Sequence, residues 1–205
     1  MTTNPHELSD PDPVPPTASV PWTVRVVRRV ETATALDRYE GPLRAVAGVL
    51  TAQGTARATL YGTWLGHALH PVLSDMPIGM WTSAVVLDLS RRPDAQPAAR
   101  LLVGAGILAA LPTAVTGVAE WGRTTPEQRR VGLVHAAGNV TALGLYGASF
   151  AARSSGRHRL GAALGLCGAA VVGAGAFLGG HMTVARKVGS RHPAFELTSE
   201  PAETG

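Results

Sequence analysis

The chain of 205 residues is 45% hydrophobic and only 16% charged, and its mean hydropathy of +0.13 is too high for an average soluble domain. The net charge of +4 comes from arginines spread between apolar runs, which favours lipid headgroups over nucleic acid as their partners. Cys167 is the single cysteine, which excludes an intrachain disulfide, a CxxCH haem attachment and a cysteine-only site for zinc or an iron–sulfur cluster.

Residues 1–21 are rich in proline, aspartate, threonine and serine, and we expect them to form a disordered N-terminal tail. They lack a basic start followed by an apolar stretch, so we expect no cleavable signal peptide. Residues 22–58 carry apolar residues at helical spacing with arginines between them, and Gly41 and Pro42 interrupt the pattern. This predicts an amphipathic helical segment that lies on the membrane surface or covers one end of a bundle; a soluble helical hairpin is the alternative.

Residues 59–190 are predicted to form a four-helix transmembrane domain. Its apolar runs, about 72–89, 101–121, 131–152 and 160–182, approach or reach the roughly 20 residues that a helix needs to cross a bilayer. The connections are short, polar and rich in arginine, which predicts an up-down-up-down order. The fold class expected is therefore all-α: a four-span transmembrane helix bundle preceded by an amphipathic helical segment and followed by a polar C-terminal tail, residues 191–205.

The distribution of arginines between the two ends favours termini in the cytoplasm. We expect a multi-pass protein of the cell's inner (plasma) membrane. On the last apolar run, Gly161 and Gly165, and then Gly175 and Gly179, recur at four-residue spacing. Small residues at this spacing let helices approach closely in lipid, so the first interpretation of these glycines is helix packing.

Alternating helix direction brings several ionisable residues to the end of the bundle where the termini lie. Ionisable groups near a membrane mark a functional site or a pairing network, and imidazole is a good ligand for iron, copper or zinc. The candidate ligands of a haem b are His70, His135 and His181. The candidate ligands of a transition-metal ion are His67, His70, His135, His181 and Glu120.

Either Asp75 or Glu120 would orient an imidazole through its second nitrogen. No HExxH motif and no Glu-x-x-His pair supports a known metal site. Each residue also has a structural interpretation. The histidines before the first span could meet headgroups, Asp75 before Pro77 could be a helix N-cap, and Glu120 could be an interfacial anchor. His135 with Asn139 could join helices through a hydrogen bond without any ligand.

Four motifs occur in order: GHALHPVLSDMPIGMWTSAVVLDL, PTAVTGVAEW, RRVGLVHAAGN and LGGHMTVARKVG. Over about residues 30–190 the chain thereby resembles the predicted bacterial membrane proteins classed as domain of unknown function 2231. Ala68 stands where that family usually has the first proline of an HPLHP-like motif, and His70-Pro71 is kept. The resemblance implies that His67, His70, His135 and His181 are recurrent polar positions. Some relatives carry a Rieske iron–sulfur domain after the fourth span, which implies a redox partner, either a separate Rieske-type protein or a quinone.

The leading hypothesis is a redox-associated membrane module that binds haem b or a metal ion and relays electrons without transforming a substrate. The alternative is a structural membrane anchor or subunit whose polar cluster only pairs helices. The third is a small proton-conducting or transport unit that uses Asp75, Glu120 and His135 as a relay. Its weakness is that it needs a continuous polar path, and the opposite leaflet offers little beyond Asp88 and the hydroxyl or amide groups of threonine, serine and asparagine.

Overall fold

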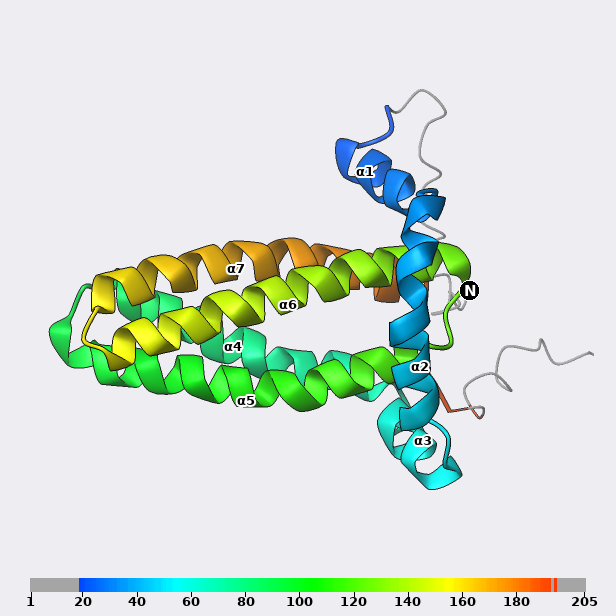
Figure 1. Ribbon diagram of the computed structural model, residues 1–205, viewed down its shortest axis with the longest axis horizontal. Helices are drawn as coiled ribbons and strands as arrows, with labels where there is room; N and C mark the ends of the chain where they lie inside the picture. Colours follow the sequence, from blue (N-terminus) through cyan, green and yellow to red (C-terminus); the bar gives the residue numbers. More distant parts are fainter. Residues whose placement is uncertain (1–18, 193, 195–205) are drawn as a thin grey trace, which may run out of the picture.

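The computed structural model describes residues 19–192 and residue 194, and within these residues every named element is helical (Figure 1). The all-α prediction is therefore confirmed. Nearly all of the two predicted tails, residues 1–21 and 191–205, lies outside the described residues.

Four long helices run side by side and antiparallel (Figure 1). They are α4 Leu69–Leu89, α5 Gln96–Trp121, α6 Pro126–Ser154 and α7 His158–Gly180. The start of α6 shows why a helix forms there. Thr125 and Gln128 form a reciprocal capping box, and Pro126 occupies the first helical position, where a missing N–H costs nothing.

Three helices of the described part of the chain are long and apolar enough to cross a membrane: Leu69–Leu89, Pro93–Trp121 and His158–Ala185. The helix α6 is as long as these, with 29 residues, but its buried face carries several polar side chains. The count of four spans therefore stays a prediction. Large apolar side chains such as Leu101, Leu108 and Leu166 are exposed on the outer faces of the long helices, as expected for surfaces that contact lipid.

The segment before the bundle lies across one end of it (Figure 1). It contains α1 Trp22–Glu31, the 3-10 helix η1 Thr34–Tyr39, α2 Glu40–Leu50 and α3 Gly54–Tyr61. The break between its first two helices falls before Gly41 and Pro42, which lie in the first turn of α2, where proline is tolerated. Ion pairs attach this segment to the bundle: Glu31–Arg186 at 2.6 Å, Asp37–Arg130 at 2.7 Å and Glu40–Arg129 at 2.8 Å.

The long helices form two hairpins, α4–α5 and α6–α7, that meet in a small apolar core. Trp81 of α4 stacks on Tyr146 of α6, with ring centroids 4.0 Å apart and planes inclined by 12°. Ala84 and Val103 complete the buried cluster. An aromatic stack thus joins the two hairpins at mid-length. The polar residues described below lie on either side of this stack along the bundle.

Candidate functional site

His70 lies in the first turn of α4 and binds the backbone of the neighbouring helix α5. Its Nδ1 lies 2.9 Å from the carbonyl oxygen of Thr113. A carbonyl can only accept, so Nδ1 carries a proton, and in the neutral ring Nε2 then keeps its lone pair. The ring lies against Gly117, where a Cβ atom would come within 2.8 Å of it. No hydrogen bond to Nε2 is found in the described part of the chain.

His135 makes the equivalent contact in the other hairpin. Its Nδ1 donates to the carbonyl oxygen of Gly175 on α7 at 2.9 Å, and its Nε2 accepts from the Asn139 amide at 2.9 Å. The imidazole is thus neutral, with the proton on Nδ1. Gly175 and Gly179 leave room for these side chains, since a Cβ at Gly179 would lie 3.4 Å from the His135 ring and one at Gly175 would lie 3.3 Å from Asn139. This glycine pair therefore makes space for polar side chains as well as for helix packing.

The two histidines face each other across the junction of the hairpins. Their ring centroids are 6.4 Å apart and the rings are perpendicular, at 89°. Both rings are oriented in the same way, with Nδ1 bound to a backbone carbonyl. Proteins fix the tautomer of a metal-binding histidine by binding its other ring N–H in this way; here the second nitrogen of His135 is occupied by Asn139.

The contacts between α4 and α6 recur at a constant offset of 65 residues. The paired residues, each in contact with its counterpart, are His70 with His135, Trp81 with Tyr146, and Asp88 with Arg153. Contacts between corresponding residues of two parallel elements are the property of an approximate two-fold axis. The bundle therefore has internal two-fold symmetry, with the axis along the helices.

The outer helices α5 and α7 follow the same symmetry at an offset of 62 residues. Thr113 and Gly175 supply the carbonyls that bind the two histidines. Gly106 lies against the indole of Trp81. A Cβ atom added at Gly168 would lie 3.0 Å from the Tyr146 ring, so Gly168 lies against that ring in the same way. The symmetry thus includes the residues that support the site.

At the opposite end of the bundle, sequence reasoning missed a buried ion pair. Arg153 is 2% exposed and donates two hydrogen bonds to Asp88, at 2.8 and 2.6 Å. Ser149 accepts a third bond from it, and Gly161 and Gly165 clear the space beside its side chain. Arg153 follows directly after the third apolar run, about residues 131–152, so the sequence predicts it in a connection. The available signal was its register, because three buried polar residues of α6 are spaced by three and then four positions: Tyr146, Ser149 and Arg153.

The other predicted site residues lie near the first end but have different partners. His181 donates from Nε2 to Glu31 at 3.2 Å, and His67 binds its neighbour's carbonyl oxygen at 3.1 Å. Glu120 is buried, and one of its carboxylate oxygens has no partner among the described residues. Within those residues, no three histidine, cysteine or acidic side chains gather closely enough to hold a metal ion. The close pair is His70 and His135.

The interpretation of Asp75 as a helix N-cap is wrong. The helix α4 begins at Leu69, with Ala68 as its N-cap residue, so Asp75 lies in the second turn. The helix can start this early because Pro71 falls in its first turn, where proline needs no hydrogen-bond acceptor. Pro77 is then inside the helix, and Asp75 is exposed on its surface.

A family model described as "Predicted membrane protein (DUF2231)" matches residues 66–192. The matched region contains all four long helices and both histidines of the pair, and it excludes α1, α2 and α3. No curated protein and no solved structure matches the chain. Because the match covers more than half of the sequence, this chain belongs to the family of predicted membrane proteins described as domain of unknown function 2231.

Proposed function

We propose that this membrane protein is an electron-transfer module in which His70 and His135 would hold a haem b between the hairpins and supply its two protein ligands. The observation that carries the proposal is the neighbouring pair of imidazoles, each with Nδ1 bound to a carbonyl. Haem iron in electron-transfer proteins is commonly held by two protein ligands, and the pair supplies two. A bare metal ion with only these two protein ligands is the less favoured form of the same proposal.

The spacing of the rings supports this assignment. Two imidazoles that share one metal hold their coordinating nitrogens about 4 Å apart, which puts the ring centres roughly 6 Å apart. The observed separation is 6.4 Å. The internal two-fold symmetry adds support, because it presents one histidine to each side of a group on the axis.

The chain's own residues would act as follows. The Thr113 and Gly175 carbonyls keep each Nδ1 protonated and hold the rings in place. Asn139 must release Nε2 of His135, which is feasible because its side chain is exposed. Haem supplies one-electron redox chemistry when it is bound. The electron partner would be a Rieske-type or other redox protein, or a quinone, in the inner membrane, with the chain's termini in the cytoplasm.

The test is a reduced-minus-oxidised visible spectrum of the full chain, produced with sufficient haem and purified in detergent, with metal analysis of the same sample. We expect paired α and Soret bands that disappear in His70→Ala and in His135→Ala. The matched controls are His158→Ala and His181→Ala, which replace histidines outside the pair and should keep both bands. A flat wild-type spectrum without stoichiometric metal contradicts the proposal, as do bands that survive loss of both paired histidines.

A structural role is the second candidate, and one observation favours it specifically. Both nitrogens of His135 already have protein partners, so the residue joins α6 to α7 without any ligand. In that case His135→Ala lowers the thermal stability of the purified protein, although no cofactor is present to be lost. The visible spectrum and the melting temperature together distinguish the two functions.

A further inference from the structure

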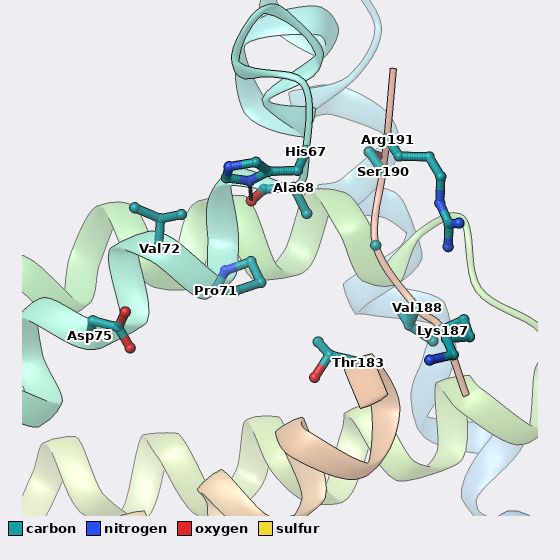
Figure 2. A pocket seen from close by; sticks show the side chains of 11 residues that line it. His67, Ala68, Pro71, Val72, Asp75, Thr183, Lys187, Val188, Ser190 and Arg191 are labelled. Atoms are coloured by element: carbon teal, nitrogen blue, oxygen red, sulfur yellow. Dashed lines mark hydrogen bonds between the residues drawn. The ribbon is translucent and has the colours of Figure 1, made fainter. Parts of the chain in front are cut away.

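A pocket of about 430 Å³ lies beside α4, at the end of the bundle that α1–α3 cover (Figure 2). One wall is formed by the start of α4, with Pro71, Val72 and Asp75. The other is formed by the chain that follows α7, with Thr183 and Lys187. The pocket contains neither residue of the histidine pair, so it is separate from the proposed haem site.

The second wall has an unusual backbone. The helix α7 ends in a π-helical turn, η4 His181–Ala185, and such turns occur frequently at functional sites. Lys187 then adopts a left-handed conformation with φ 54°, which is uncommon for a residue other than glycine. The strand-like segment after it is tied back to the bundle, because the His192 amide donates to the Gly66 carbonyl at 2.9 Å. The segment is thereby held next to the residues that precede α4.

Opposite charges face this pocket without neutralising each other. Asp75 stands on α4, and Figure 2 shows its carboxylate turned toward the space in front of Thr183. Lys187 belongs to the other wall, and Arg191 lies at the rim. Within the described residues, Asp75, Lys187 and Arg191 form no ion pair. A ligand that carries a cation and an anion a few atoms apart could pair its cation with Asp75 on one wall and its anion with Lys187 on the other.

The surroundings indicate that such a ligand is a lipid. Apolar side chains next to the pocket are exposed on both walls: Val72 and Met76 on α4, and Val184 on η4. The pocket lies where two of the candidate spans end, Leu69–Leu89 and His158–Ala185. Headgroups lie at that level of a bilayer and acyl chains lie deeper, along exposed apolar surfaces.

We propose that this pocket binds the headgroup of a zwitterionic phospholipid with a primary ammonium group, phosphatidylethanolamine. The phosphate pairs with Lys187, assisted by Arg191, and the ammonium donates to Asp75. A choline headgroup has no N–H to donate to the carboxylate. An anionic glycerol headgroup brings no cation to Asp75 and is repelled by it.

The test is a titration of delipidated full-length protein in a neutral detergent with short-chain phosphatidylethanolamine, phosphatidylcholine and phosphatidylglycerol, and with water-soluble glycerophosphoethanolamine. Binding is measured as the rise in the melting temperature of the protein with increasing ligand concentration. We expect the ethanolamine lipid to bind most tightly. Asp75→Asn should weaken its binding by about tenfold, the size of effect expected for a charge-assisted hydrogen bond, and should weaken choline-lipid binding by a smaller factor, because the choline cation loses only its charge attraction to the carboxylate. Lys187→Gln should weaken the binding of all three lipids. The matched control is Asp94→Asn, an exposed acid at the opposite end.

Three results would overturn the proposal. The first is equal binding of ethanolamine and choline lipids to the wild-type protein. The second is tighter binding of the glycerol lipid, which would make the pocket an anion site. The third is equally tight binding of glycerophosphoethanolamine, which would make the ligand a soluble molecule and exclude the acyl-chain contacts.

Discussion

Removing one partner of the buried Asp88–Arg153 pair should destabilise the bundle strongly. In Asp88→Asn the guanidinium of Arg153, 2% exposed, loses a carboxylate that accepts two hydrogen bonds, at 2.8 and 2.6 Å. Breaking a buried pair in this way costs about 3–5 kcal/mol, because an uncompensated charge is left in a low-dielectric interior. We therefore expect the free energy of unfolding to fall by about 3 kcal/mol or more.

The chain contains a matched control. Arg92 and Asp94 form a pair with the same shortest distance, 2.6 Å, but their side chains are 70% and 66% exposed. Asp94→Asn should cause no measurable change, because solvent already screens that pair. Reversible unfolding in mixed detergent micelles, followed by circular dichroism, gives the two free-energy changes under identical conditions.

A double-mutant cycle completes the experiment. The cycle consists of Asp88→Leu, Arg153→Met and the variant with both changes. Each single variant leaves one buried charge unpaired, whereas the double variant leaves none and should recover much of the lost stability. Equal effects of Asp88→Asn and Asp94→Asn would refute the reasoning, since burial would then make no difference. So would a double variant that is as unstable as the sum of its single changes.

Two further predictions concern the ends and the centre of the bundle. The hydrogen bond from Arg186 lowers the pKa of Glu31 below its usual 4.5. The stability that this ion pair contributes is therefore fully present above about pH 4.5 and is lost as the pH falls through the lowered pKa. The measurement is amide hydrogen exchange in α1, corrected for intrinsic rates, which should become faster at acid pH. In Glu31→Gln this dependence on pH should disappear. At the centre, Gly106→Ala puts a Cβ into the indole of the core tryptophan and should cost about 1–3 kcal/mol in detergent unfolding. Gly144→Ala meets nothing within 4 Å and should be neutral or stabilising by up to about 1 kcal/mol; equal losses in both variants would contradict the packing argument.

The long helices were predictable because apolar runs of sufficient length are a direct consequence of burial in lipid. Their starts were less predictable. Asp75 and Pro77 together form a strong helix-start signal, yet α4 begins at Leu69, two residues before Pro71. Both prolines are compatible with a nearby helix start. The earlier start is accompanied by a tertiary contact that the local rule does not include, the hydrogen bond from the His70 ring to the Thr113 carbonyl on α5.

The position of the site residues along the bundle was predictable, but the direction in which their side chains point was not. Alternating helices put His70, His135 and His181 at one end, and that reasoning gives their height along the bundle. It does not give the face of the helix from which each side chain projects. His181 binds Glu31, a residue 150 positions earlier in a segment that lies outside the bundle. Arg153 was missed for the opposite reason, because a charge at a helix end looks like a loop residue until its register with Ser149 is followed.

The internal symmetry has a consequence for how the two hairpins recognise each other. A homodimer of one hairpin brings the same side chain to the axis twice. Two histidines or two aromatic rings can meet in that way, but two aspartates or two arginines would repel each other. Because both hairpins belong to one chain, corresponding positions can carry opposite charges, as Asp88 and Arg153 do. This pair therefore permits α4–α5 to pair with α6–α7 and opposes pairing of either hairpin with a copy of itself.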